Sequence, residues 1–382
     1  MRSRAIKLLI VFGFLLRMGI SIWNGFWGPS FGADLDAVSF HLSAVAYSKN
    51  LVLDEFVIGH IYSYILGIVY FLTTDSLFVG SLLSTIAWLA SALVLLKIMK
   101  LLSLEKIKQF KAMLIYALLP SSIFLTSITL RESYQLFFVN LAIFSSLKIY
   151  FNKSTLYWVV LFFAVLGMGS LHGALFMFGL FIVISTIFLA VSRGRDGFPL
   201  ARFIFVAPLV ALIVFYGLSL FTSIAYNLHD GLGAAIVSYQ KGELAEIVRT
   251  NYKTSINING ISKLLLFVPV SLFQYLFEPM PWRVSAAIDI DSVFENILRA
   301  WLIWKAWAGM YNMPTRERRP LLFVFLSYLV VETIWSLGTI NWGTAVRHHI
   351  PSIGLLVVSA FAYSAKGRCI RTTLLPSVKG IR

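Results

Sequence analysis

The chain has 382 residues, of which 59% are hydrophobic and only 13% are charged, and its formal net charge is +15. So apolar a composition excludes an ordinary soluble protein and indicates a polytopic membrane protein for which lipid is the main solvent. The basic residues stand in short clusters between apolar runs, as in cytoplasmic loops that face anionic lipid, so nucleic acid is not expected as a partner. A single cysteine, Cys369, excludes a disulfide framework and any multi-cysteine metal site.

The first apolar run, residues 5–23, is expected to cross the membrane with its basic start, Arg2, Arg4 and Lys7, in the cytoplasm. No small-residue cleavage site follows, so the run is interpreted as a retained anchor and not as a signal peptide. Arg17 lies late in this span, near the expected outer interface, where its side chain can snorkel or face a polar cavity.

The next segment is expected outside and carries an acidic island in the sequence G-A-D-L-D-A-V-S-F-H, with Asp34, Asp36 and His41. Apolar residues recur at helical spacing over 36–47, which predicts a helix lying in the membrane interface. Residues 56–72 are interpreted as a second interfacial helix. Counting them as a span would carry the lysine cluster that follows the next span, 77–96, to the outer face, against the positive-inside rule.

The remaining spans are assigned by the same rule, which places loops rich in Lys and Arg in the cytoplasm. Between 222 and 260 lies the longest polar stretch, expected as an external loop. Of the apolar segments 261–277 and 293–308, only one can cross, and the sequence leaves open which one. The other expected spans are 110–130, 134–150, 156–171, 175–191, 203–221, 321–337 and 350–363. This gives an all-α bundle of about ten spans in a single integral membrane domain, residues 1–382, with both termini in the cytoplasm.

Ionisable residues gather at the outer face of this topology, where five separate segments deliver them. Asp34 and Asp36 enter a helix from a Gly/Pro loop, where a carboxylate can accept a proton from a hydroxyl nucleophile or bind a divalent cation. N-capping of the helix is an equally good interpretation. His41 lies about one turn beyond Asp36, where it could meet that carboxylate or simply face the surface.

Later segments add cations to the same face. Arg131 and Glu132 end one span, as a snorkelling arginine or as a phosphate clamp with an orienting carboxylate. His172 occupies a turn. Glu278 stands in F-E-P-M-P-W-R, where an interfacial aromatic anchor is the simpler account. Three potential cations at the outer face run against the positive-inside trend, and an anionic ligand such as a lipid phosphate would explain them; they are Arg347, His348 and His349.

The segment D-A-V-S-F-H-L-S-A after the first span, followed by two juxtamembrane helices and a span that ends in a basic loop, resembles the N-terminal module of GT-C-type membrane glycosyltransferases. The motifs L-P-S-S-I-F-L-T-S-I-T-L-R-E, F-E-P-M-P-W-R and N-W-G-T-A-V-R-H-H-I-P are similar to motifs in bacterial membrane proteins linked to surface-polysaccharide assembly. The resemblance implies a GT-C-like module over 1–221 and a variable module over 222–382.

The resemblance also implies roles. The acidic residue of the first external loop is the catalytic base or part of a metal site, a role that falls on Asp36 or Asp34, and Glu132 corresponds to the acid that begins the second external loop. A divalent cation, Mg²⁺ or Mn²⁺, is the one cofactor implied, although the metal-binding pattern of oligosaccharyltransferases is absent.

The function expected from these observations is transfer of a sugar from a polyprenyl-phosphate- or polyprenyl-diphosphate-linked donor to a glycan or lipid hydroxyl, outside the bacterial cytoplasmic membrane. Phosphate-binding residues would be His41, Arg131, His172, Glu278, Arg347, His348 and His349. A Wzy-like polymerase of repeat units is an alternative of the same class. A flippase for lipid-linked sugars is the alternative that is not an enzyme; it predicts internal repeats and ionisable groups near the bilayer midplane.

Overall fold

Helices form every regular element of the computed structural model, which describes residues 2–28, 34–51, 60–152, 155–192, 249–252, 261–311 and 313–362. Within these described residues, six helical segments are long and apolar enough to cross a membrane: Ser3–Phe26, Leu77–Leu101, Glu132–Asn152, Gly173–Val191, Arg318–Gly338 and Trp342–Ala362. The all-helical fold is therefore confirmed, and several apolar helices are consistent with a membrane protein, whereas the total of about ten spans stays a prediction. The expected span 203–221 and most of the expected loop 222–260 lie outside the described residues.

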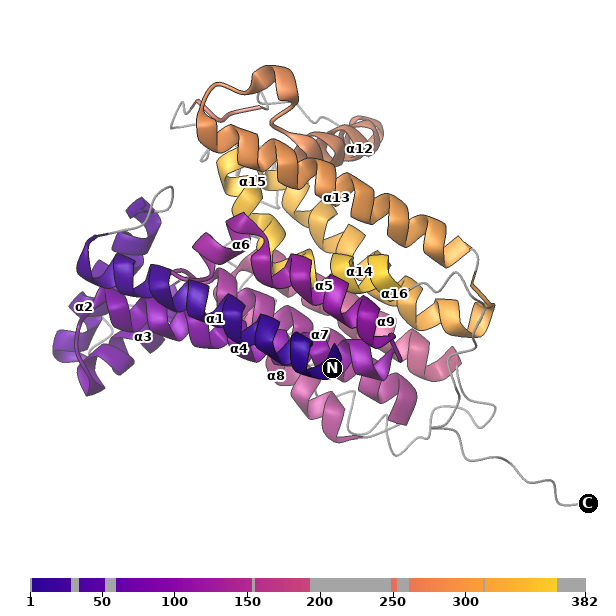
Figure 1. The fold of residues 1–382 in the computed structure, drawn as a ribbon, viewed down its shortest axis with the longest axis horizontal. Coiled ribbons are helices and arrows are strands. Elements are labelled where there is room, and N and C mark those ends of the chain that lie inside the picture. Colours follow the sequence, from indigo (N-terminus) through magenta and orange to yellow (C-terminus); the bar gives the residue numbers. More distant parts are fainter. Residues whose placement is uncertain are drawn as a thin grey trace, which may run out of the picture.

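The first half of the chain forms a layer of neighbouring helices. Helix α1 (Arg2–Phe26) packs on α4 (Leu77–Leu101), α4 on α7 (Glu132–Asn152), α7 on α8 (Leu156–Leu171), and α8 on α9 (Gly173–Ser192). These bounds match the expected spans to within a few residues. In Figure 1, α1, α4 and α8 lie together on one side of the molecule.

The two helices expected after the first span are present as α2 (Asp34–Asn50) and α3 (Ile61–Leu72). They pack against each other beside one end of α1 and α4 (Figure 1). The contact is close at Gly67, where an added Cβ would lie 2.8 Å from the carbonyl oxygen of Ala44. With 12 residues, α3 is too short to span a bilayer as a straight helix, which agrees with its interpretation as an accessory helix.

The segment 110–130, expected as one continuous span, is broken. Helix α5 (Lys106–Leu118) ends before Pro120, and α6 (Pro120–Leu125) starts a separate turn. Proline lacks an N–H and forces the preceding Leu119 into an extended conformation, which stops the helix. Backbone groups freed in this way need partners inside an apolar bundle.

Two ionisable side chains form hydrogen bonds with the backbone groups that the break leaves unpaired. Glu295 accepts hydrogen bonds from the amide (2.8 Å) and the hydroxyl (2.6 Å) of Ser121. In an unbroken helix the Ser121 amide would pair with the Ala117 carbonyl. That carbonyl instead accepts a hydrogen bond from Arg17, at 2.9 Å.

The Arg17 side chain is fully buried, so it does not snorkel to the interface. It donates to the hydroxyls of Thr126 (2.7 Å) and Ser122 (3.1 Å), and its guanidinium lies 3.7 Å from the centre of the Trp88 ring. A cation in this position joins α1, α4 and the α5–α6 break. The snorkelling interpretation of this residue is therefore wrong.

Helix α13 (Ala287–Tyr311) runs along the bundle (Figure 1), but neither α13 nor the helix over 261–277 is among the candidate membrane spans of the described residues, so which of 261–277 and 293–308 crosses stays open. Near its start Asp289 accepts a hydrogen bond from Trp342, and near its end the ammonium of Lys305 lies 3.5 Å from the ring centre of Phe361. These two positions of α13 are about 24 Å apart at a helical rise of about 1.5 Å per residue.

Helix α12 (Ile261–Phe277) packs against α13 and α14 (Thr315–Gly338). Ser271 donates to the carbonyl of Ser336 near the end of α14. Arg299 of α13 donates to the carbonyl of Leu276 at 2.9 Å and so caps the end of α12.

The last helical stretch differs from expectation. The residues N-W-G-T-A-V-R-H-H, expected as an external loop, form helix α15 (Trp342–His349), which continues through the 3-10 turn η3 (Ile350–Ser352) into α16 (Ile353–Ala362). The side chain of Asn341 caps α15 by accepting the Thr344 amide at 2.7 Å. Residues 353–361 are all buried, so α16 is the centre of the bundle.

Substitution Arg17→Ala tests the role of the buried cation. It leaves the Ala117 carbonyl and two hydroxyls without their donor, so the free energy of unfolding should fall by about 3 kcal/mol or more. The midpoint of detergent-induced unfolding of the purified protein measures this. Arg4→Ala, on an exposed part of the same helix, is the control; equal midpoints for both variants would contradict the assignment.

Candidate functional site

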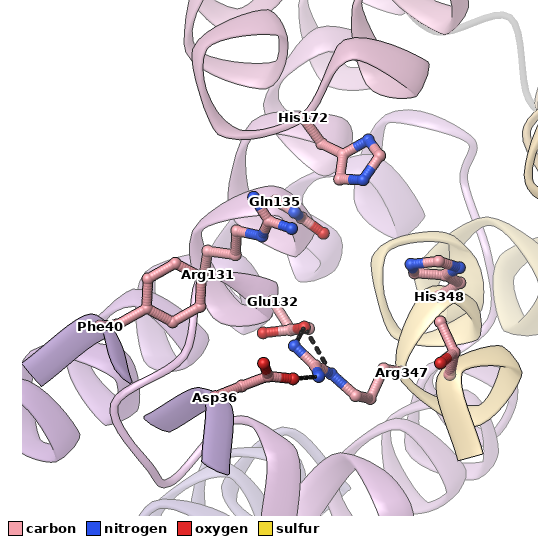
Figure 2. Close-up of a pocket in the computed structure, with 9 residues that line it drawn as sticks. Asp36, Phe40, Arg131, Glu132, Gln135, His172, Arg347 and His348 are labelled. Atoms are coloured by element: carbon pink, nitrogen blue, oxygen red, sulfur yellow. Dashed lines mark hydrogen bonds and ion pairs between the residues drawn. The ribbon is translucent and has the colours of Figure 1, made fainter. Parts of the chain in front are cut away.

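A cavity of about 190 Å³ lies where four segments that are remote in sequence meet. They are the start of α2, the start of α7, the turn between α8 and α9, and helix α15. Figure 2 shows the side chains of these segments around one space. The lining residues are Asp36, Phe40, Arg131, Glu132, Gln135, His172, Thr344, Arg347 and His348.

The start of α7 is held by a seam of small polar side chains. Residues 126–130, which connect α6 to α7, are all buried, and their backbone needs partners. Ser84 donates to the carbonyl of Leu130, and Ser133 donates to the carbonyl of Thr126, each at 3.2 Å. This seam places Arg131 and Glu132 at the cavity.

Helix α15 is held from its first turn. Trp342 donates its indole N–H to Asp289 at 3.2 Å, and Arg249 forms a two-point ion pair with the same carboxylate, at 2.5 and 3.1 Å. Burial alone would raise the pKa of Asp289, but these donors and the amides of Ser285 and Ala286 outweigh it and hold that pKa below its usual range. The ionised Asp289 therefore fixes the helix that carries Arg347.

Arg347 bridges two carboxylates. Its Nε and a terminal nitrogen donate to Oε1 of Glu132 at 3.0 and 2.8 Å, and its other terminal nitrogen forms an ion pair with Asp36 (Figure 2). The two pairs differ in burial: the Glu132 side chain is 4% exposed, whereas that of Asp36 is 54% exposed. The Glu132 pair is thus an interior contact, and the Asp36 pair lies at the solvent-facing side of the cavity.

Glu132 has one oxygen left over. Its Oε2 is buried and has no hydrogen-bond partner among the residues that the structure describes. A buried carboxylate oxygen without a donor costs free energy, so such an atom points to a ligand or water that completes it.

Arg131 forms the opposite wall with aromatic and imidazole groups. It donates to the carbonyl of Leu171 at 3.0 Å, and its guanidinium lies 5.4 Å from the ring centre of Phe40. His172 and His348 lie 5.9 Å apart, ring centre to ring centre, and His348 stacks on Trp335 at 3.8 Å. The cavity therefore combines two guanidinium groups, two carboxylates and two imidazoles.

Six of the ten residues singled out from the sequence line this cavity: Asp36, Arg131, Glu132, His172, Arg347 and His348. Their roles in binding or catalysis remain predictions. Asp34 is the first residue of α2, and its side chain lies outside the described part of the chain.

Three further predicted residues lie elsewhere. His41 is five positions beyond Asp36, about 140° around the helix, and its Nδ1 lies 2.9 Å from the hydroxyl of Tyr70. Glu278 pairs with Arg283 at 2.9 Å and accepts the Met280 amide, so it holds the turn after α12. Neither residue is among those that line the cavity.

His349 points away from its neighbours Arg347 and His348 because successive helical positions differ by about 100°. It is buried, with its Nδ1 2.5 Å from Glu332 and its Nε2 3.2 Å from the carbonyl oxygen of Tyr275. Glu332, fully buried on α14, was not singled out from the sequence. An acidic residue inside an apolar run was the signal that could have identified it.

Phe40, Gln135 and Thr344 are cavity residues that sequence reasoning missed. Each lies three or four positions from a predicted residue on the same helix: Phe40 from Asp36, Gln135 from Arg131 and Glu132, and Thr344 from Arg347 and His348. This helical spacing could have identified them.

The donor set does not fit a divalent cation. In the part of the chain that the structure describes, no three His, Cys, Asp or Glu side chains come together as metal ligands. The two carboxylates that do converge are bridged by Arg347, whose positive charge takes the place that a cation would need.

A double-mutant cycle tests the difference between the two ion pairs. The coupling free energy between Glu132→Gln and Arg347→Met should be about 2 kcal/mol, because this pair is buried. The coupling between Asp36→Asn and Arg347→Met should be below about 1 kcal/mol, because this pair is half exposed and screened by solvent. Unfolding midpoints of the purified variants give both values; a stronger coupling at Asp36 would contradict the geometry.

Comparison with known proteins does not add a family: no family model, no curated protein and no solved structure matches the chain. The function is therefore argued from the chemistry of the cavity.

Proposed function

We propose that the protein is a membrane glycosyltransferase that transfers a sugar from a polyprenyl-phosphate-linked donor to an acceptor hydroxyl at the outer face of the bacterial cytoplasmic membrane. The observation that carries the proposal is the half-paired carboxylate of Glu132 beside two arginines. A glycosyl transfer of this kind needs a base for the incoming hydroxyl and cations for the departing phosphate, and the cavity offers both.

Glu132 is the base in this proposal. Its Oε1 is held by Arg347, and its Oε2 is buried without a partner among the described residues, so the free oxygen is available to accept a hydroxyl proton. The sequence alone favoured Asp36. That carboxylate is half exposed, and solvent competes for it, so it suits a gating contact better than proton abstraction.

Arg131 and Arg347 are the phosphate-binding residues. Before the donor arrives, Arg347 is neutralised by two carboxylates. The donor phosphate can displace the exposed Asp36 from Arg347 at small cost, since half-exposed pairs contribute little to stability. The buried contact with Glu132 would persist and keep the base oriented.

The acceptor oxygen forms a bond to the anomeric carbon, and the bond from that carbon to the phosphate oxygen breaks. The electron pair leaves with the lipid phosphate, which the two arginines stabilise, and the hydroxyl proton moves to Glu132 Oε2. Preorganised charges of this kind commonly supply the largest part of a rate enhancement.

A Wzy-like polymerase would use the same residues with a diphosphate leaving group, and the acceptor would be the next repeat unit. The two versions differ in what accumulates when the base is removed. Single lipid-linked repeat units would indicate a polymerase, and a sugar-deficient acceptor would indicate a single-sugar transferase. If the protein were a flippase, an inactive variant would leave the intact lipid-linked sugar on the cytoplasmic face of the membrane.

Glu132→Gln is the decisive substitution. It keeps the shape of the side chain and an oxygen for Arg347 but removes the base, so transfer should fall by about 100-fold or more. The measurements are the surface-polysaccharide profile of cells that carry the variant and the lipid-linked sugars extracted from their membranes.

Glu105→Gln is the matched control, because Glu105 is exposed at the start of α5, far from the cavity residues along the bundle. Asp36→Asn should reduce transfer by about tenfold or less, since it changes the gating contact only. A normal polysaccharide profile with Glu132→Gln present at normal protein level would refute the proposed function.

A further inference from the structure

The hydrogen bonds of His172 fix which of its ring nitrogens carries the proton. Its Nδ1 lies 3.2 Å from the backbone nitrogen of Ala174, the second residue of α9. A backbone N–H can only donate, so Nδ1 must accept and must be unprotonated. In the neutral ring the proton is therefore on Nε2, and His172 presents an N–H donor away from the start of α9.

His348 is fixed in the opposite form. Its Nδ1 lies 2.9 Å from the hydroxyl oxygen of Thr339, and that hydroxyl also lies 2.9 Å from the carbonyl oxygen of Trp335. Both contacts are hydrogen bonds only when the Thr339 proton is directed to the Trp335 carbonyl and the hydroxyl oxygen accepts a proton from Nδ1–H, because a carbonyl can only accept. The lone pair of His348 is therefore on Nε2.

Neighbouring groups hold both rings in place and keep them neutral. The Trp335 ring stacks on His348 at 3.8 Å and meets His172 edge to face at 4.3 Å. Burial and the nearby guanidinium groups of Arg131 and Arg347 lower the pKa of His172 to about 3. The same two positive charges line the cavity beside His348, which disfavours a third cation there.

Both rings line the cavity that holds Glu132 and Arg347, and Figure 2 shows them on the side opposite Asp36 and Phe40. Among the described residues, neither Nε2 atom has a hydrogen-bond partner. Neither atom is fully buried, so a ligand in the cavity can reach both. Both nitrogens are therefore available to a ligand, together with Glu132 Oε2.

We propose that His172 and His348 form a neutral donor–acceptor pair that recognises the phosphate-linked sugar, with His172 Nε2–H donating to a phosphate oxygen and His348 Nε2 accepting a sugar hydroxyl. The ligand class rests on the proposed function, whereas the assignment of donor and acceptor rests on the hydrogen bonds alone. Arg131 and Arg347 would supply charge to the phosphate, and the histidines would supply direction and select for a sugar.

Asparagine and glutamine separate the two nitrogens of each ring, because the amide of Asn replaces Nδ1 and the longer amide of Gln reaches the position of Nε2. His172→Asn keeps the acceptor for the Ala174 amide and loses the donor in the cavity. His172→Gln does the reverse. The same pair at His348 keeps the contact with Thr339 in Asn and a cavity acceptor in Gln.

The test uses the purified full-length protein, with inorganic phosphate and the 1-phosphates of glucose, galactose and mannose as probes and calorimetry as the readout. His172→Asn should weaken every probe by about tenfold or more, because a hydrogen bond to a charged group is lost. His348→Asn should weaken the best sugar phosphate by a similar factor and leave inorganic phosphate within about threefold. Each Gln variant should lose less affinity than its Asn partner, although its unfolding midpoint falls further.

A purely structural role for the histidines predicts the reverse order, because the Gln variants would then be the more damaged in both readouts. That order, or equal losses in the Asn and Gln variants, would overturn the proposal. Wild-type protein that binds none of the probes at millimolar concentration, or binds no sugar phosphate better than inorganic phosphate, would overturn it as well. Binding that follows the prediction without any glycosyl transfer would contradict the proposed function and leave this inference standing.

Discussion

The Arg347–Glu132 ion pair joins two parts of the chain that lie 215 positions apart in sequence. Taking either charge out of water is costly, and the pair offsets that cost only because Arg347 donates two hydrogen bonds to one carboxylate oxygen. The surrounding helices are arranged to allow this contact. The polar seam around residues 126–130 sets the start of α7, and Asp289 with Asn341 sets the start of α15. The cavity is a consequence of that contact and is lined by the groups next to it.

The same need to satisfy polar groups in an apolar bundle explains the other buried charges. Pro120 breaks a helix, and Arg17 and Glu295 supply the donor and the acceptors that the broken backbone requires. Arg299 does the same for the end of α12. None of these three side chains lines the cavity, although each is an ionisable residue in an apolar setting. In this protein, a buried ionisable side chain can therefore complete the hydrogen bonds of an interrupted backbone and need not mark a functional site.

The sequence predicted the helical, membrane-type architecture and most helix bounds, because apolar length and periodicity are local properties. It also predicted six cavity residues, because polar groups at one end of several apolar runs must lie at one face. It failed where distant contacts decide the outcome. Nothing near Arg17 reveals that its partners lie about a hundred residues away, and nothing near R-H-H reveals that His349 points away from the cavity that Arg347 and His348 line. The roles of Asp36 and Glu132 could be ranked only from their exposure and pairing.

The central claim, that the start of α7 meets α15, can be tested without knowing the function. Cysteines placed as Glu132→Cys and Arg347→Cys, with Cys369→Ser to remove the native thiol, should be joined within one chain by a short bifunctional thiol reagent and detected by mass spectrometry of the digested protein. The pair Glu105→Cys and Arg347→Cys, whose helices place them at opposite ends of the bundle, should remain unjoined. An absent crosslink for the first pair, or equal yields for both pairs, would contradict the account.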